Sequence, residues 1–357
     1  MYPRISIDLN KLKHNLDYLT GLLHSRGISC AIVTKVFCAD ERIVKLIDSS
    51  SADMFADSRT QNLARIHSQK PRLLLRIGMQ PEADEIVSCA EISMQSEFST
   101  LHALESAAKR LGLRHKVILM VDMGDLREGI FNTDEERIME TARFIASSPA
   151  LELYGVGVNL TCYGGTLPDE NNLGGLVRIV EKLRRELKEE IPVVSGGNSS
   201  TMGMLISDEV PAGVNHLRLG ESFVLGNDTA TGVPVPGLFT DAFVLEAEIV
   251  ELQTKPSKPI GKSGPNAFGE YLEYPDRGMM RRAILAIGRQ DVAVEGLSPE
   301  DPDAEILGAS SDHLIVNLTS CSREYRVGDV MRFIPDYGAL LRLCTSNYVD
   351  RHYIDLK

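Results

Sequence analysis

A single lysine closes a short apolar run near the amino terminus of the 357-residue chain. Lys35 follows Ala31-Ile32-Val33-Thr34, whose length and composition predict a buried β-strand. An ammonium group at the end of a buried strand is costly unless it is neutralised, paired with an acid or bound covalently. Lys35 is therefore either half of a structural ion pair or a lysine with a chemical function.

Two glycine- and hydroxyl-rich turns follow later apolar runs. They are Ser195-Gly196-Gly197-Asn198-Ser199-Ser200-Thr201 and Arg218-Leu219-Gly220-Glu221-Ser222. Glycine permits close approach to the backbone and hydroxyl groups donate hydrogen bonds, so both turns suit a phosphate group. Gly-Asn-Ser-Ser also starts a helix well, which leaves a purely structural cap as the alternative.

Two further apolar runs end in polar residues. These ends are Asp122-Met123-Gly124-Asp125-Leu126-Arg127-Glu128-Gly129 and Asn159-Leu160-Thr161-Cys162-Tyr163-Gly164. Asp122 and Arg127 are also placed to pair with each other. A lysine, a phosphate-binding turn, an arginine and flat polar groups at one rim are what a pyridoxal phosphate site requires.

These residues share a rim if the runs before them are parallel strands of a barrel. From about residue 10 to about 230, short apolar runs alternate with amphipathic stretches, the pattern of parallel βα units. The expected strands are Cys30–Lys35, Met54–Ala56, Leu73–Ile77, Glu91–Met94, Val117–Val121, Leu153–Leu160, Pro192–Ser195 and His216–Leu219. The sequence therefore predicts an α/β fold, a closed (β/α)8 TIM barrel with its active face at the strand carboxyl ends.

The amphipathic stretches predict helices that cover this barrel. They are Leu12–Leu23, Arg42–Ile47, Thr100–Leu111, Glu135–Ile145 and Leu176–Leu187. Ser99 or Thr100 is the expected N-cap of the third helix, and Thr133 or Asp134 that of the fourth.

The pattern changes after residue 230, where glycines and prolines cluster. The runs that follow alternate between apolar and polar residues, namely Phe243–Leu252, Ala283–Ile287, Leu314–Leu318 and Val330–Ile334. They predict a C-terminal β-rich domain, with which the alternating run Ile5–Leu9 is expected to pair. The expected domains are residues 10–232 and residues 233–357 together with 1–9.

Composition excludes several classes of protein. Hydrophobic residues make up 43% and charged residues 25%, as in globular proteins. The net charge is −12, and basic residues such as Arg184 are interleaved with acids such as Glu186, which argues against a nucleic-acid partner. No apolar run is long enough to span a bilayer, and there is no secretory signal or C-x-x-C pair, so we expect a cytoplasmic protein with free thiols.

Over nearly the whole chain, these residues resemble the fold-type III pyridoxal phosphate enzymes headed by alanine racemase. The matching motifs are Ile7-Asp8-Leu9-Asn10-Lys11-Leu12, Val33-Thr34-Lys35, Asp122-x-Gly124 through Arg127-x-Gly129, Gly197-Asn198-Ser199-Ser200 and Leu217-Arg218-Leu219-Gly220. The resemblance implies pyridoxal 5'-phosphate as cofactor, a free amino acid as substrate, no metal, and a head-to-tail homodimer whose partner subunit completes the active site.

The resemblance also implies roles for individual residues. The cofactor-binding residues would be Lys35, Asn159, Asn198, Ser199, Arg218, Gly220 and Glu221, with Arg127 at the substrate. Lys35 would bind the cofactor covalently and exchange a proton at one face of the substrate's Cα. Arg218 would face the pyridine nitrogen and keep it unprotonated, which suits reversible proton exchange.

Two tyrosines of the alanine racemases are missing from this chain. Ala39 stands four residues after the lysine, and Arg289 aligns with the second catalytic tyrosine. We expect His313 to serve the opposite face instead, with Asp312 to orient or replace it, because imidazole transfers protons near neutral pH. A turn of solvated polar residues is the alternative. Rival sources of the base or of substrate contacts are Gly288-Arg289-Gln290-Asp291, Tyr337 and Cys344.

Four segments resemble the ornithine racemases of this family more specifically. They are Met1–Ile5, Phe55–Arg59, Gly155–Gly164 and Leu225–Ala230. They imply a diamino acid substrate, whose side-chain ammonium needs a carboxylate partner. The candidate carboxylates are Asp40, Asp122, Asp228, Asp312 and Asp336.

Other functions remain as alternatives. One is racemisation of alanine, serine or lysine, and another is a metal-assisted aldolase or dehydratase of the same fold, to which Ser310-Ser311-Asp312-His313 bears a faint likeness. No paired histidine and cysteine ligands follow that turn. A third is a non-catalytic protein of pyridoxal phosphate homeostasis, although single-domain proteins of that kind lack a β-domain.

Overall fold

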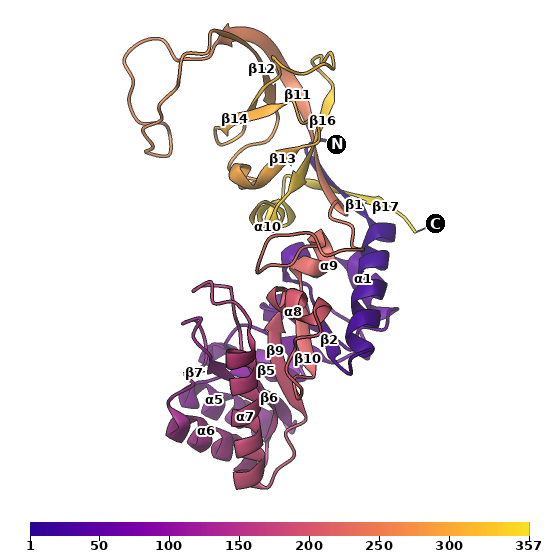
Figure 1. Cartoon of the computed structure of the whole chain (residues 1–357), viewed down its shortest axis with the longest axis vertical. Helices are drawn as coiled ribbons and strands as arrows, with labels where there is room; N and C mark the ends of the chain where they lie inside the picture. Colours follow the sequence, from indigo (N-terminus) through magenta and orange to yellow (C-terminus); the bar gives the residue numbers. More distant parts are fainter. Residues whose placement is uncertain (357) are drawn as a thin grey trace. The chain divides into compact units, whose positions relative to one another are not determined.

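The computed structural model describes residues 1–356, which form two compact units (Figure 1). One unit is Lys11–Thr240, and the other is Met1–Asn10 together with the chain from Asp241 onward. Among the described residues, no helix is both long and apolar enough to cross a membrane.

The first unit contains a closed barrel of eight parallel strands. They are β2 (Ser29–Val33), β3 (Met54–Asp57), β4 (Arg72–Leu74), β5 (Ile92–Gln95), β6 (His115–Asp122), β8 (Leu151–Gly157), β9 (Val193–Asn198) and β10 (His216–Leu219). The pairings of β10 with β2 and of β5 with β6 close the ring, and the two-residue strand β7 (Ile130–Phe131) pairs with β6 outside it. The predicted (β/α)8 barrel is confirmed.

Apolar side chains at alternate strand positions pack together inside this ring. The cluster includes Ala31 and Val33 of β2, Met54 and Ala56 of β3, and Ile118 of β6. Successive side chains of a strand point to opposite faces, so the other set meets the surrounding helices. This cluster makes much of the barrel interior apolar, with Arg218 opposite Ala31 as a buried exception.

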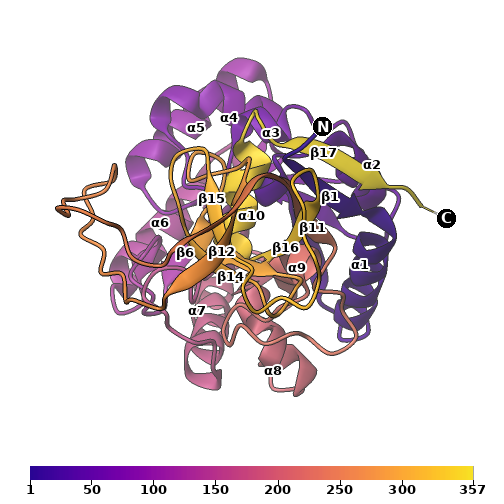
Figure 2. The same cartoon turned by 90° about the horizontal axis from the view of Figure 1, so that it is seen from above.

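Helices alternate with the strands and surround them (Figure 2). They are α1 (Leu9–His24), α2 (Glu41–Asp48), α3 (Thr60–Leu63), α4 (Ala83–Cys89), α5 (Phe98–Leu111), α6 (Glu135–Ser147), α7 (Glu170–Leu187), α8 (Met202–Ile206) and α9 (Glu221–Leu225). Asp134 is the N-cap of α6, as predicted, since its carboxylate accepts the backbone N–H of Arg137. The predicted cap at Ser99 or Thr100 is wrong because α5 begins earlier, at Phe98, whose ring packs against Phe144.

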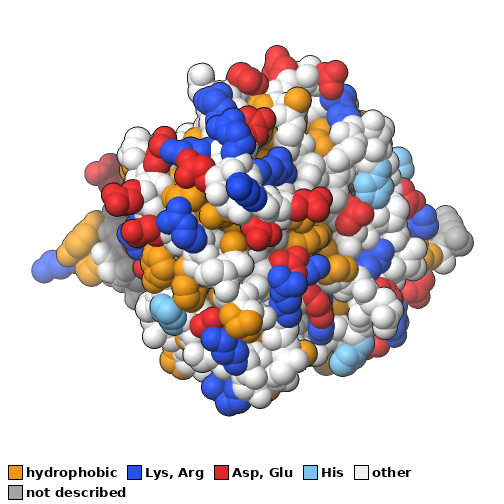
Figure 3. All heavy atoms as spheres, turned by 90° about the horizontal axis from the view of Figure 1, so that it is seen from below, with side chains coloured by type: hydrophobic (Ala, Val, Ile, Leu, Met, Phe, Trp, Pro, Cys, Tyr) orange, Lys and Arg blue, Asp and Glu red, His pale blue; other side chains and the backbone are white. Residues whose placement is uncertain are grey.

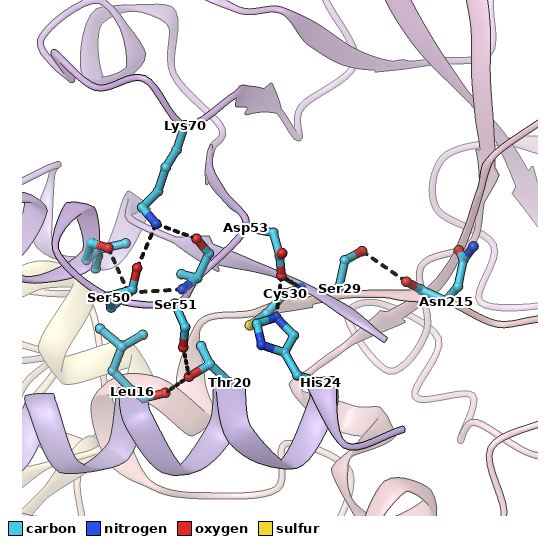
Figure 4. A network of polar contacts seen from close by, with 12 residues as sticks. Leu16, Thr20, His24, Ser29, Cys30, Ser50, Ser51, Asp53, Lys70 and Asn215 are labelled. Atoms are coloured by element: carbon cyan, nitrogen blue, oxygen red, sulfur yellow. Dashed lines mark hydrogen bonds and ion pairs between the residues drawn. The ribbon is translucent and has the colours of Figure 1, made fainter. Parts of the chain in front are cut away.

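A polar network lies at the amino end of β2 and at the residues before its neighbouring strands (Figure 4). Lys35 follows the opposite end of β2. One oxygen of Asp53 accepts the backbone N–H of Cys30 at 2.7 Å and lies 2.8 Å from Nε2 of His24. Ser29 at the start of β2 donates to the carbonyl of Asn215 at 2.9 Å. These bonds anchor β2, the strand that leads to Lys35, at its far end.

The surface carries both signs of charge. Figure 3 shows Lys and Arg side chains interspersed with Asp and Glu over one face of the molecule. Many form pairs, such as Lys182 with Glu135 at 2.7 Å and Arg72 with Glu91 at 2.6 Å. Exposed pairs of this kind add little stability, so they chiefly keep the surface free of a large field of one sign.

The second unit is built on an antiparallel sheet. Its elements are β1 (Arg4–Asp8), β11 (Phe243–Pro256), β12 (Met279–Leu285), β13 (Leu297–Pro299), β14 (Glu305–Ala309), β15 (Leu314–Asn317), β16 (Val330–Pro335), β17 (Asp350–Ile354) and helix α10 (Tyr337–Thr345). The strand order is β13-β16-β11-β12-β15-β14, and β1 pairs with both β11 and β17. The connection between β11 and β12 is a long projecting loop (Figure 1).

Candidate active site at the carboxyl ends of the barrel strands

Lys35 lies at the rim of the barrel, just beyond β2. The strand ends at Val33, two residues before the predicted end at Lys35, and Lys35 begins a 3-10 turn, Lys35–Phe37. The half-buried side chain has a lowered pKa, chiefly because burial disfavours its charged form, while the charge of Cys162 opposes this effect. A lowered pKa makes more of the neutral, nucleophilic amine available near neutral pH.

A buried carboxylate lies beside the backbone that presents Lys35. Asp57, at the end of β3, is fully buried and accepts hydrogen bonds from the Thr34 hydroxyl at 2.5 Å and from the Asn62 amide at 3.1 Å. Burial raises the pKa of Asp57, although these hydrogen bonds work in the other direction. The site prediction missed Asp57, and the signal was available, since an acid closes this apolar strand as a lysine closes the preceding one.

Arg218 is buried inside the rim and fixed by two neighbours. Its guanidinium donates to the carbonyl of Val158 at 2.8 Å and to the hydroxyl of Ser195. That hydroxyl is also 2.7 Å from Nδ1 of His216 and forms a hydrogen bond with it. Burial lowers the pKa of His216 to about 3 and that of Arg218 to about 10, so near neutral pH the imidazole is neutral and the guanidinium charged.

Hydroxyl groups join the two turns predicted to hold phosphate. Ser199 Oγ accepts the backbone N–H groups of Gly220 at 3.2 Å and Ser222 at 3.1 Å, which brings the ends of β9 and β10 together. Its own proton is left to be donated to a ligand. Ser200 Oγ is buried and has no hydrogen-bond partner within residues 1–356. A buried orphan hydroxyl is costly, and an anionic ligand at this turn would satisfy it.

A cluster of two amides and a thiol lies between β8 and β9. The amide nitrogen of Asn198 donates to Asn159 Oδ1 at 3.2 Å and lies 3.5 Å from Cys162 Sγ. The thiol itself lies 3.6 Å from Asn159 Oδ1. Asn159 is 8% exposed, and its Nδ2 has no hydrogen-bond partner within the described chain. Cys162 was not among the predicted site residues, although it stood in one of the polar strand ends.

The loop after β6 carries Arg127 to the same region. Arg127 pairs with Glu128, with Nη2 and Oε1 2.5 Å apart, and the charges of both residues act on the pKa of Lys35. The alternative pairing of Arg127 with Asp122 is not what the structure shows. Asp122 instead accepts the backbone N–H groups of Gly124 and Leu126 at 2.8 and 3.2 Å.

The candidates predicted in the β-rich sequence lie in the other unit. Asp312 and His313 are exposed, and they line a pocket of about 630 Å³ with neighbours that include Ile287, Gln290 and Asp291. Arg289, at the position of the missing tyrosine, is held by Glu270 at 3.0 Å. Of the rival bases, Asp291 accepts from Ser346 at 2.7 Å, Tyr337 begins α10, and Cys344 is buried.

Four of the five carboxylates predicted as ammonium partners bind the backbone. Asp40 caps α2, Asp336 caps α10, Asp122 closes its own loop and Asp228 accepts the N–H of Ala230 at 2.9 Å. The Asp312 carboxylate makes no hydrogen bond or ion pair within residues 1–356. It is the one of the five whose side chain has no structural task in the described chain.

Several known proteins are similar to this chain in sequence or in fold. Residues 7–228 match the family model of the alanine racemase N-terminal domain. Ornithine racemase of Acetoanaerobium sticklandii is 47% identical over 355 residues, 99% of this chain and 100% of that protein. Lysine racemase of Thermotoga maritima is 35% identical over 356 residues, 99% of each chain.

Solved structures agree at the level of the fold. Alanine racemase from Streptomyces lavendulae superposes with a TM-score of 0.75 at 15% identity, over 100% of this chain and 98% of its own. Alanine racemase from Bartonella henselae, solved with covalently bound pyridoxal phosphate, gives 0.73 at 15% identity, over 98% and 99%. Together with the sequence matches, these structures confirm the predicted resemblance, and this chain belongs to the alanine racemase family.

Proposed function

We propose that this chain is a pyridoxal phosphate-dependent racemase that interconverts L- and D-ornithine or a closely related diamino acid. The observation that carries the proposal is the convergence of Lys35, with its lowered pKa, the buried Arg218 and the hydroxyls of Ser199 and Ser200 on one rim. The two curated relatives are named for ornithine and lysine, which supports a diamino acid over alanine or serine.

The residues at the rim fit pyridoxal 5'-phosphate. Lys35 has the amine to bind its aldehyde, and Arg218 offers a cation to its ring nitrogen. The hydroxyls of Ser199 and Ser200, in the turn beside Gly220–Glu221, offer donors to its phosphate. Two buried polar atoms without partners in residues 1–356, Ser200 Oγ and Asn159 Nδ2, are accounted for if the cofactor is their partner.

The bound cofactor would supply a sink for the electron pair left at Cα when a proton is removed. Lys35 holds or returns the proton on its own face of Cα. A charged Arg218 disfavours a second positive charge at the ring nitrogen, which weakens the sink and favours prompt return of the proton. Arg127 contacts the substrate from the loop after β6.

The opposite face of Cα and the substrate side chain need groups in addition to Lys35 and the residues proposed to hold the cofactor. His313 is one candidate for the second proton-transfer group, although Asp312 makes no hydrogen bond to its imidazole within residues 1–356. Asp312 is also the carboxylate left available to a side-chain ammonium. For these residues to serve a barrel rim from a partner subunit, the protein must be a homodimer, which sedimentation equilibrium of the holoenzyme tests. We also place the protein in the cytoplasm, as its free thiols favour.

Lys35 provides the decisive experiment. Lys35→Ala is expected to lose the cofactor's visible absorbance band and racemisation together, while Lys45→Ala, which removes an exposed lysine paired with Glu41 on α2, keeps both. Alanine, serine, lysine and ornithine are screened by chiral separation, with solvent-deuterium exchange at Cα as a second readout. An unchanged spectrum in Lys35→Ala overturns the cofactor role. A wild-type holoenzyme that exchanges deuterium into neither enantiomer of ornithine overturns the racemase and favours cofactor homeostasis.

A further inference from the structure

The barrel rim holds a second group able to exchange a proton close to Lys35. Cys162 lies in the loop after β8, and its thiol is exposed. The thiol's charge acts on the pKa of Lys35, Arg127 and Arg218 alike. The thiol is therefore within electrostatic reach of the groups proposed to hold cofactor and substrate.

The position of Cys162 is fixed by a buried aspartate. Asp125, 1% exposed, accepts the backbone N–H groups of Thr161, Tyr163 and Thr166 at 3.0, 3.1 and 3.2 Å. Thr161 has a φ of 67°, a left-handed conformation that a β-branched residue adopts only where its surroundings impose it. The loop is therefore built to hold the residue at position 162 in one place.

Two amides orient the thiol. Cys162 Sγ lies 3.6 Å from Asn159 Oδ1 and 3.5 Å from Asn198 Nδ2, so an acceptor and a donor flank the sulfur. Nδ2 of the same Asn159 amide is buried and has no partner within residues 1–356. An orphan donor one amide group away from the thiol indicates that a ligand atom occupies the space beside both.

We propose that Cys162 is the second catalytic acid–base group, which exchanges a proton with the substrate's Cα on the face opposite Lys35. The proposal rests on the proposed racemase function. It places the second proton-transfer group within the barrel. Neither Ala39 nor Arg289 has a side chain suited to this role, and Arg289 is paired with Glu270.

Each turnover moves two protons. In one direction the Cα–H bond breaks and its proton forms an S–H bond with the Cys162 thiolate, while the Lys35 ammonium gives a proton to the other face of Cα. In the other direction the Lys35 amine removes the Cα proton and the Cys162 thiol supplies the new one. The substrate gains and loses one proton, and exchange with water restores both side chains.

The test removes the thiol and follows each enantiomer of ornithine separately in D2O with the holoenzyme. Cys162→Ala is expected to lower racemisation by about 10²–10⁴-fold, the usual contribution of one acid–base group. It is expected to keep deuterium exchange, with retention, for the enantiomer whose Cα–H faces Lys35 and to lose it for the other. Cys321→Ala, which removes a thiol of the β-rich unit, is the matched control and should racemise like the wild type.

Alkylation gives a readout that does not depend on activity. Iodoacetamide should label Cys162, and ornithine should slow this labelling in the holoenzyme, as measured by peptide mass spectrometry. Labelling that ornithine leaves unchanged argues that the substrate does not approach the thiol and overturns the proposal.

Three further outcomes also overturn it. One is Cys162→Ala with wild-type racemisation, and another is loss of the cofactor's absorbance band in this variant, which would assign the thiol to cofactor binding. The third is deuterium exchange that His313→Ala keeps for one enantiomer of ornithine and loses for the other, which would assign the second proton transfer to the imidazole. A wild-type enzyme that exchanges neither enantiomer refutes the racemase function itself and is distinguishable from all three.

Discussion

Thr34 donates a 2.5 Å hydrogen bond from its hydroxyl to the fully buried carboxylate of Asp57. Thr34 immediately precedes Lys35, and its backbone N–H is bonded to the carbonyl of Ala56 on the same neighbouring strand. Two bonds therefore tie the residue before Lys35 to β3. Lys35 takes its position from this double attachment, since the strand itself has already ended.

Asp57→Ala should destabilise the fold. It leaves the donors of Thr34 and Asn62 buried without their acceptor, at a cost of about 1–3 kcal/mol for each. We expect the free energy of unfolding in urea to fall by about 2–4 kcal/mol on the same principle. Asp17→Ala, which removes a half-exposed acid paired with Lys13, is the control and should change it little. Equal stability of the two variants would contradict a structural role for Asp57.

The raised pKa of Asp57 also gives a pH signature. Its folded-state pKa lies above the ordinary value of 3.8, so the protonated form is favoured by folding, and this contribution is lost as the pH rises through the folded pKa. Asp57→Asn cannot titrate. The free energy of unfolding of the wild type, relative to that of this variant, should therefore fall as the pH is raised from 3.8. A difference between the two that stays constant with pH would refute the raised pKa.

Two buried histidines should make the protein acid-sensitive. Burial lowers the pKa of His216 to about 3 and that of His115 to about 4, from 6.5, so unfolding below pH 6.5 binds protons that the folded state excludes. The stability from the neutral imidazoles is complete above pH 6.5 and is lost as the pH falls toward 4, by about 1.4 kcal/mol per pH unit and histidine. In urea titrations, His216→Gln should make the free energy of unfolding depend less steeply on pH. The same steepness in the variant and the wild type would contradict this prediction.

Ser195→Ala should loosen the arginine at the rim. The change removes the acceptor of Arg218 and the hydrogen-bond partner of His216 in one step, and it leaves a gap among buried polar groups. We expect weaker binding of pyridoxal phosphate, measured by titration of the apoenzyme, and a free energy of unfolding lower by about 1–3 kcal/mol. Ser25→Ala, which removes an exposed hydroxyl at the end of α1, should alter neither quantity.

Gly164→Ala should disturb the loop that carries Cys162. A Cβ at Gly164 would lie 2.6 Å from the carbonyl oxygen of Asp125, so the loop must shift. Racemisation should fall while the unfolding transition stays cooperative. The matched change Gly21→Ala, in α1 where a Cβ meets nothing within 4 Å, should instead stabilise the protein by about 0.5–1 kcal/mol. Full activity of Gly164→Ala would show that the loop position is unimportant.

The barrel could be predicted from sequence because its signals are local. Each strand is an apolar run and each long helix an amphipathic one, so both are visible within about ten residues. β6, expected at Val117–Val121, spans His115–Asp122, and β10 has the expected bounds, His216–Leu219. Short, weakly alternating strands such as β14 (Glu305–Ala309) have no such signal and were missed.

The site could be predicted only in part, because its contacts are distant in sequence. Lys35 and Arg218 stand out because they are charged residues in apolar runs. The turns at Ser199 and Gly220 stand out because they are rich in glycine and hydroxyl residues. The placement of Cys162 depends on Asp125, 36 residues before Thr161, and no local pattern links them. The orientation of Arg218 likewise depends on Ser195, 23 residues earlier, on the neighbouring strand.

The pairing of β1 with β11 and β17 sets an order on synthesis. Arg4–Ile7 leaves the ribosome before its partners, because its antiparallel partners begin at Phe243 and its parallel partners at Asp350. Domains generally fold as units while the chain is being made, so all eight barrel strands emerge before the sheet that must receive the first strand exists. During that interval the nascent chain carries an unpaired strand, and its Ile5 and Ile7, which are buried in the folded protein, are exposed to solvent.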